Sequence, residues 1–89
     1  MQEFRVGDLV VSTAGRDMGA FYVIVEIINE NYVALCDGKN KPIESPKKKK
    51  IKHILSLGQH EDDFESKISQ KDVDSNAFIK KILKNFEKS

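Results

Sequence analysis

Residues 10–28 decide the fold of this chain, and they read VVSTAGRDMGAFYVIVEII. Two runs rich in valine, isoleucine and aromatic residues flank a five-residue segment that begins with Gly15 and ends with Gly19. Such runs suit the pleated, half-buried surface of a sheet, and glycine tolerates the positive φ of a bulged turn. The stretch therefore predicts a β-hairpin with Arg16 and Asp17 projecting from its loop, a position in which polar residues often have a function.

The length and the cysteine content limit what the chain can be. Eighty-nine residues suffice for one small domain, whose core typically supplies about 3–5 kcal/mol of net stability. A deep catalytic cleft is not expected in a domain of this size. The single cysteine, Cys36, excludes an intramolecular disulfide, and there is neither a signal-peptide pattern nor a long apolar run. We therefore expect a cytoplasmic protein without a membrane span.

The charges are nearly balanced in number but unevenly distributed. Fifteen lysine and arginine residues and 14 acidic residues give a formal net charge of +1. Residues 39–53 contain one acid, Glu44, and seven lysines: Lys39, Lys41, Lys47, Lys48, Lys49, Lys50 and Lys52. An acidic run over residues 61–65 follows. A basic cluster of this kind commonly binds a polyanion such as a nucleic acid.

Further strands are expected after the first hairpin. Residues 32–36 are rich in β-forming side chains, and Asp37–Gly38 is typical of a tight hairpin turn. Because Pro42 lacks an amide proton, residues 43–44 can form only an edge strand, and residues 51–55 are expected to form the fifth strand. Since no helix separates the strands, a parallel α/β fold is excluded. The sequence predicts a mainly β fold, a small twisted barrel or sandwich of four or five strands.

The second strand predicts which faces of the sheet are covered. If Glu26 lies in solvent, alternation places one apolar set inside the barrel: Val23, Val25 and Ile27. It sends a second set to the opposite face: Tyr22, Ile24 and Ile28. That second face is too apolar to remain bare, so we expect another part of the chain to cover it.

The C-terminal third has a different composition. We divide the chain into a barrel over residues 1–58, an acidic linker with a weak helix over residues 59–73, and an amphipathic helix over residues 74–89. The helix is expected from an apolar stripe at helical spacing: Phe78, Ile79, Ile82, Leu83 and Phe86. A helix this short is marginal in water unless its apolar side is covered, so we expect it to pack on the face of Tyr22, Ile24 and Ile28.

Two other roles for the C-terminal helix remain open. It could dock on another protein or on a second copy of the chain. Its basic residues could also bind RNA, as a second surface besides the basic cluster of residues 39–53: Lys80, Lys81, Lys84 and Lys88. Contact with a membrane is disfavoured by the acidic residues just upstream.

Three short stretches stand in a recognisable order: Gly7–Asp8, the loop from Gly15 to Gly19, and the strand end Val25-Glu26-Ile27. Together they resemble the KOW motif, which several ribosomal proteins and transcription factors share. Residues 32–38 and the lysine run that ends at Lys52-His53-Ile54 look more specifically like bacterial relatives of the archaeal and eukaryotic "L-fourteen-e" large-subunit ribosomal protein. The similarity covers about residues 4–55 and leaves out the C-terminal third.

The resemblance implies an SH3-like barrel whose first hairpin loop and basic rim contact RNA. Gly15 and Gly19 would shape the KOW loop around Asp17, and Arg16 would contact phosphate. Many KOW loops have a basic residue where this chain has Met18, which moves the expected RNA contacts toward the seven lysines of residues 39–52. Those lysines could instead be a solvated rim that prevents an edge strand from pairing with another chain.

The remaining candidate residues favour structural roles. Phe21, Tyr22 and Tyr32 could stack on unpaired bases, but aromatic residues in strands are more often part of a core. The other potential metal ligands, Cys36, His53 and His60, lack zinc-ligand spacing, so we expect neither a metal nor another cofactor. There is no phosphate-binding glycine loop and no recognisable nucleophile–base pair, so the chain is not expected to be an enzyme.

The sequence thus predicts an RNA-binding module. Its expected ligand is ribosomal RNA or the RNA of a ribosome-related complex, contacted through the phosphate backbone by Arg16 and the lysines. A ribosomal or translation-related protein is a further expected partner, and a monomer is the expected state. The alternative is an SH3-like adaptor that binds proteins and no nucleic acid.

Overall fold

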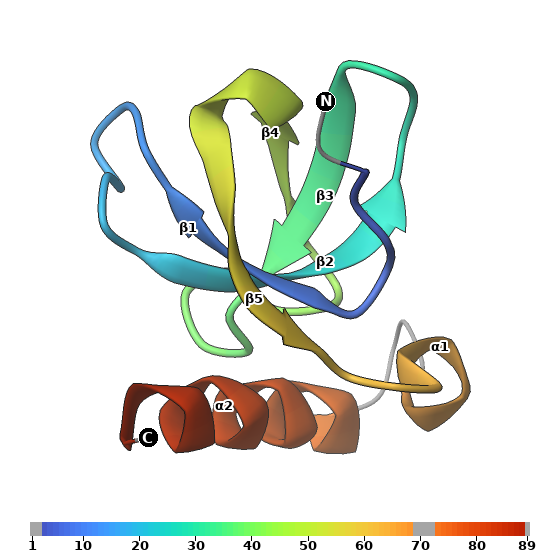
Figure 1. Cartoon of the computed structure of the whole chain (residues 1–89). Coiled ribbons are helices and arrows are strands. Elements are labelled where there is room, and N and C mark those ends of the chain that lie inside the picture. Colours follow the sequence, from blue (N-terminus) through green and yellow to red (C-terminus); the bar gives the residue numbers. More distant parts are fainter. Residues whose placement is uncertain (1–2, 69–72, 89) are drawn as a thin grey trace.

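Five antiparallel strands form one strongly curved sheet in the order β4-β3-β2-β1-β5 (Figure 1). The structure is a computed structural model that describes residues 3–68 and 73–88. The strands are β1 (Asp8–Ser12), β2 (Phe21–Ile27), β3 (Tyr32–Cys36), β4 (Lys47–Lys50) and β5 (Ile54–His60). The helices are the 3₁₀ turn η1 (Ile51–His53), α1 (Phe64–Lys67) and α2 (Val73–Lys88). The predicted mainly β fold, a small SH3-like barrel with a C-terminal helix, is confirmed.

The first hairpin forms where the sequence predicts it. Val10 lies opposite Tyr22, and Val11 lies opposite Phe21, in the β1–β2 register. Both loop glycines have positive φ, +86° at Gly15 and +91° at Gly19, a conformation that other residues resist. The β1–β2 loop is therefore a defined backbone structure, as the two glycines predict.

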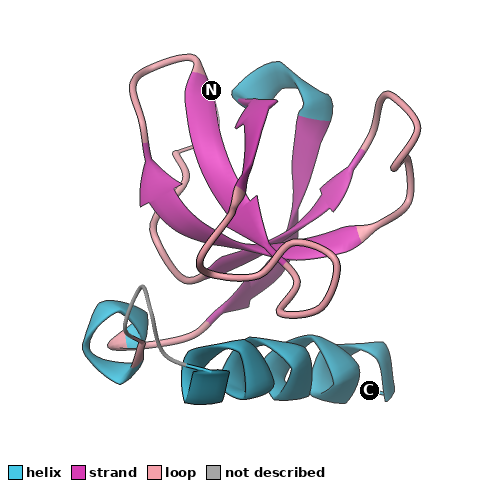
Figure 2. Cartoon of the chain, turned by 180° about the vertical axis from the view of Figure 1, so that it is seen from behind, coloured by secondary structure: helices cyan, strands magenta, loops and turns pink. Residues whose placement is uncertain are grey.

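The sheet has an apolar cluster on each side. The barrel interior is filled by Val10, Tyr22, Ile24, Val33, Leu35 and Ile54. The opposite side of the sheet meets the helices in a second cluster, formed by Leu9, Val23, Cys36, Ile43, Phe64, Ile79 and Leu83. Figure 2 shows α2 lying beneath the strands on that side. The domain therefore has two thin cores that share one sheet.

The predicted faces of β2 are reversed. Tyr22 and Ile24 fill the barrel interior, whereas Val23 and the partly buried Val25 meet the helices. Because both faces of β2 are covered, alternation separates the two sets of side chains but does not say which set is inside. A register shift between Ile24 and Glu26 also breaks the alternation, and Ile27 is 40% exposed.

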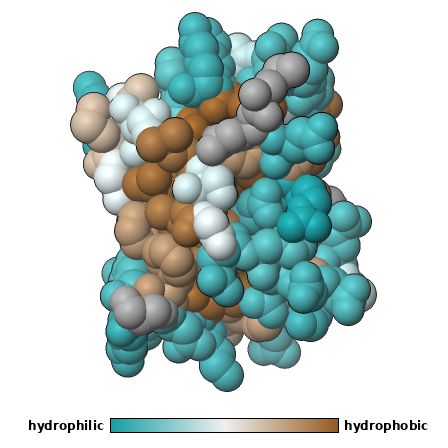
Figure 3. Space-filling model, in the orientation of Figure 1, coloured by the Kyte–Doolittle hydropathy of each residue, from teal (hydrophilic) through white to brown (hydrophobic). Residues whose placement is uncertain are grey.

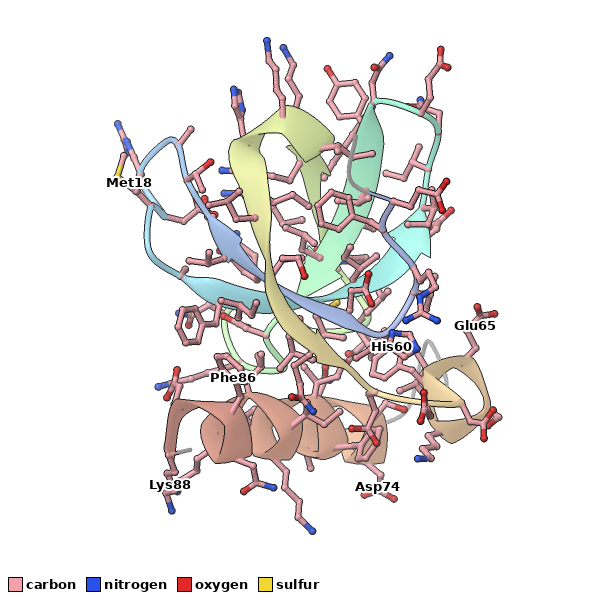
Figure 4. The ribbon with its side chains drawn as sticks, in the orientation of Figure 1. Met18, His60, Glu65, Asp74, Phe86 and Lys88 are labelled. Carbon is pink, nitrogen blue, oxygen red and sulfur yellow. The ribbon has the colours of Figure 1, made fainter. Side chains whose placement is uncertain are left out.

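The helix α2 covers its own barrel, the first of the three roles considered for it. It packs on the face of Val23 and not on that of Tyr22 and Ile24, so the predicted face is wrong. Phe86 of α2 meets Phe21 of β2 edge to face, with ring centroids 5.7 Å apart. Figure 4 shows Phe86 pointing from α2 toward the sheet. No helix within residues 3–68 and 73–88 combines the length and the apolar character needed to cross a membrane.

The connection from β3 to β5 differs from the prediction. The tight turn at Asp37–Gly38 is instead the start of a longer β3–β4 loop over residues 37–46. The Asp37 carboxylate directs this loop, because its Oδ1 accepts the backbone N–H groups of Lys39 and Lys41 at 2.9 and 2.8 Å. Residues 43–44 form a turn and no strand, and the lysine run itself is β4. Residues 51–53 form η1, so the fifth strand begins only at Ile54.

Candidate nucleic-acid interface

The four lysines of β4 alternate between two environments. Lys49 is buried and Lys47 is half-buried, whereas Lys48 and Lys50 are exposed. This alternation follows from the pairing of β4 with β3, in which successive side chains point to opposite faces. The run that looks uniform in the sequence is therefore divided in the fold.

The buried side of β4 is held by Asp17 of the β1–β2 loop. Oδ1 of Asp17 accepts hydrogen bonds from Lys49 Nζ at 2.8 Å and from Ser12 Oγ at 2.9 Å. Oδ2 accepts one from Tyr22 OH at 2.8 Å and lies 3.2 Å from Lys47 Nζ. Lys49 Nζ also donates to the backbone oxygen of Ala14 at 2.8 Å. Asp17 thus ties the β1–β2 loop to β4, and we refer to Ser12, Asp17, Tyr22, Lys47 and Lys49 as the Asp17 cluster.

The prediction that Asp17 projects from its loop is wrong. Its side chain is 15% exposed and turns toward β4, while Arg16 beside it is exposed. The sequence hides this arrangement because Asp17 and Lys49 are 32 residues apart. A buried lysine needs an anionic partner, and Asp17 is that partner.

The cluster shifts the ionisation of its members. Burial by itself raises the pKa of the Asp17 carboxyl, but the hydrogen bonds it accepts, the largest effect coming from Lys49, hold that pKa well below its usual range. Burial, the hydrogen bond to Asp17 and the negative charge of Asp17 raise the pKa of Tyr22. Asp17 is therefore ionised and Tyr22 is a neutral donor at neutral pH.

The depressed pKa of Asp17 predicts a loss of stability in acid. Its stabilising effect is complete above the pKa of an unfolded aspartate, near 3.8, and disappears as the pH falls toward the lower pKa of the folded state. We expect the free energy of unfolding to fall between pH 5 and about pH 2, and to fall less in Asp17→Asn than in the wild type. Urea unfolding at several pH values measures this difference, and equal falls in the two proteins would contradict it.

Four exposed cations remain on the opposite end of the barrel from α2. Arg16 is in the β1–β2 loop, Lys48 and Lys50 are in β4, and Lys52 is in η1. Figure 1 shows the β1–β2 loop and η1 at that end. The backbone N–H of Thr13 donates to His53 O at 2.9 Å, which joins the loop to η1. We call Arg16, Lys48, Lys50 and Lys52 the basic rim.

The basic rim has no carboxylate partners among the described residues. None of the ion pairs formed within residues 3–68 and 73–88 includes any of its four cations. Lys48 Nζ lies 4.5 Å from the centre of the Tyr32 ring, which positions the lysine without neutralising it. These charges are therefore available to an anionic ligand.

The seven predicted lysines thus fall into three groups. Lys48, Lys50 and Lys52 belong to the basic rim, whereas Lys47 and Lys49 are tied to Asp17. Lys39 and Lys41 lie in the β3–β4 loop, which Figure 1 shows on the α2 side of the barrel. The fold does not bring the seven together on one surface.

Cysteine and histidine take structural positions. Cys36 is buried under α2, where burial and then the charges of Asp37 and Glu44 raise its pKa to about 12. His60 Nδ1 lies 2.7 Å from Asp8 Oδ1, and Asp8 Oδ2 accepts the backbone N–H of Arg5. These contacts anchor the end of β5 to the start of β1, and the part of the chain that the structure describes holds no cluster of three metal-ligating side chains.

Part of the chain is similar in sequence to a ribosomal protein. The large ribosomal subunit protein eL14 of the archaeon Staphylothermus marinus is 35% identical to this chain over 57 residues. The match covers 64% of this chain and 59% of eL14, so the chain spans about three fifths of that relative's length. No family model matches the chain.

Proposed function

We propose that this protein is an RNA-binding module of the cytoplasm that associates with ribosomal RNA or with a ribosome-related complex. The observation that carries the proposal is the basic rim, in which four cations that form no ion pair within residues 3–68 and 73–88 share one end of the barrel. The similarity to the large-subunit protein eL14 supports RNA as the polyanion. We propose a binding role and not a catalytic one, with a ribosomal or translation-related protein as a second partner.

The chemistry of the rim suits the phosphate backbone. Lysine and arginine bind phosphates by charge and by release of counterions, which gives affinity without a choice of sequence. The exposed Arg16 would contact phosphate beside the lysines of β4 and η1, and Gly15 and Gly19 would shape its loop as a KOW loop. The expected mode is recognition of the shape of a folded RNA.

The Asp17 cluster supports the rim indirectly. Lys47 and Lys49 do not face the solvent freely, but they fix the β1–β2 loop against β4 through Asp17. The spacing between Arg16 and the exposed lysines of β4 is then set before any RNA binds. Preorganisation of this kind reduces the entropy lost on binding.

Reversal of two rim charges tests the proposal. We expect Lys50→Glu/Lys52→Glu to weaken binding of a labelled RNA stem-loop by roughly 100-fold, because each charge-assisted contact contributes about 1.5 kcal/mol or more. The wild-type affinity should also fall steeply with salt. Fluorescence anisotropy at two salt concentrations measures both effects.

The matched control reverses two lysines of α2 that lie far from the rim. Lys81→Glu/Lys88→Glu introduces the same change in charge, and both side chains are exposed. It should weaken binding much less than the rim variant. An affinity for RNA that changes neither with the salt concentration nor with either pair of substitutions would contradict the proposal.

A protein-binding adaptor is the second candidate function. The supporting observation is a row of three apolar residues across neighbouring strands. Leu55 of β5 lies opposite Val11 of β1, and Val11 lies opposite Phe21 of β2. The side chain of Leu55 is 52% exposed. Figure 3 shows an apolar band on the face where β5 lies in front. An exposed apolar row on a sheet can mark a protein contact. Failure of the RNA test would favour this function.

A further inference from the structure

A hollow of about 470 Å³ lies between α2 and the β3–β4 loop. Three lysines line it: Lys39 from the loop, and Lys80 and Lys84 from successive turns of α2. Its apolar lining includes Phe21 and Leu83. None of these lysines belongs to the basic rim, which lies at the other end of the barrel.

We propose that this hollow is a second phosphate-binding site for the same RNA, formed jointly by the β3–β4 loop and α2. The inference rests on the proposed function, since it assigns a further site to the RNA that the rim binds. It gives α2 a function besides covering the barrel. We call Lys39, Lys80 and Lys84 the helix-side site.

The helix-side site is held in shape by contacts between the loop and α2. Asn76 Oδ1 accepts the backbone N–H of Ile43 at 2.7 Å, and Asn76 Nδ2 donates to Glu44 Oε1 at 2.6 Å. Gly38 approaches α2 so closely that a Cβ there would collide with the backbone oxygen of Asn76. Lys39 is therefore fixed near α2 by its immediate neighbour in the chain.

The charge of the site remains available for a ligand. Its lining also includes Asp37 and Glu87, but the ion pairs formed within the described ranges include none of its three lysines. Asp37 Oδ1 accepts two backbone N–H groups of its own loop, which orients the carboxylate without removing its charge, so three positive and two negative side chains line the hollow. Lys47 and Lys49 differ from these three lysines, because each forms an ion pair with Asp17. Because lysines outnumber carboxylates in this lining and form no ion pair among the described residues, the hollow suits an anionic group such as a phosphate.

The position of the site limits the kind of RNA that can use it. The basic rim and the helix-side site lie on opposite sides of a molecule whose longest extent is 31 Å. An RNA strand held on one side of the barrel would reach one of the two sites only. An RNA that contacts both must be folded around the barrel or must offer two separate segments, and a structured RNA satisfies this requirement.

The four lysines of α2 provide a matched comparison. Lys80 and Lys84 line the hollow, whereas Lys81 lines a different depression, beside Gln59 and Asn85. Lys88 points away from the sheet in Figure 4. Lys80→Gln/Lys84→Gln and Lys81→Gln/Lys88→Gln therefore remove equal charge from the same helix, but only the first pair removes it from the hollow.

The test measures the affinity of the full chain for a labelled structured RNA between about 50 and 200 mM salt. Each lost phosphate contact lowers the slope of log affinity against log salt by about 1, so Lys80→Gln/Lys84→Gln should lower it by about 2. The loss of affinity over this salt range then becomes about 16-fold smaller than in the wild type. Acetylation of lysines, read by mass spectrometry, should show Lys39, Lys80 and Lys84 protected by RNA.

The possible outcomes separate the two proposals. A lower slope in Lys80→Gln/Lys84→Gln alone, together with protection of the three lysines, supports the helix-side site. Equal slopes in the two variants, with rim-dependent binding intact, would overturn the helix-side site and leave the proposed function standing. No RNA binding by the wild type would overturn both.

Discussion

Asp17→Asn is expected to lower the free energy of unfolding by about 3 kcal/mol, because it leaves the buried Lys49 without a negative partner. Asparagine has nearly the size of aspartate, so the packing of the loop is preserved and the loss reflects the charge. The net free energy of unfolding of a domain of this size is about 3–5 kcal/mol, so the substitution would remove most of the stability. Urea unfolding followed by circular dichroism measures the change.

Two further variants show whether the charge is the cause. Asp62→Asn makes the same chemical change at a side chain that is 95% exposed, and it should alter stability by less than about 0.5 kcal/mol. Lys49→Met added to Asp17→Asn removes the unpaired cation and should recover much of the loss, because an apolar replacement of a buried pair is often tolerated. A loss in Asp17→Asn no larger than in Asp62→Asn would contradict the prediction.

The strands of the first hairpin are predictable because their signals are local. Valine, isoleucine and aromatic residues specify β structure within a few positions, and Gly15 and Gly19 specify the turn between them. The apolar stripe of α2 is equally local. The inside of the barrel is harder to identify, because β2 is covered on both faces and the apolar neighbours Val23 and Ile24 are both fully buried. Only the position of α2 decides between the two faces.

The candidate site was predicted less well than the fold. A run of four lysines contains no apolar residue to show which side chains turn inward. The residues next to Lys49 in the sequence therefore do not indicate that it is buried. Its partner Asp17 lies 32 residues away in the chain, beyond the reach of any periodic pattern. Arg16 and three of the lysines, Lys48, Lys50 and Lys52, are exposed and form the basic rim, and Lys39 is exposed on the α2 side. Their contacts with RNA remain a prediction.

The second large effect is expected at Gly38, where the β3–β4 loop meets α2. Gly38→Ala should lower the free energy of unfolding by about 3 kcal/mol or more, because a backbone penalty and a steric penalty combine. The φ of +78° disfavours a side chain by about 1–2 kcal/mol. The new Cβ would also collide with the backbone oxygen of Asn76 and lie 2.9 Å from Lys80 Cγ, so the loop and α2 would have to separate. Hydrogen exchange should show the amides of α2 losing protection before those of the barrel.

Gly58→Ala is the matched control for this change. Gly58 has nearly the same φ, +76°, but a Cβ there would meet no atom within 4 Å. Its substitution should therefore cost only the conformational penalty of about 1–2 kcal/mol and should leave the exchange of α2 unchanged. The difference between the two variants measures the contact between the loop and α2, on which the helix-side site depends. If both substitutions cost the same, that contact contributes nothing to stability, and Lys39 has no fixed position relative to Lys80 and Lys84.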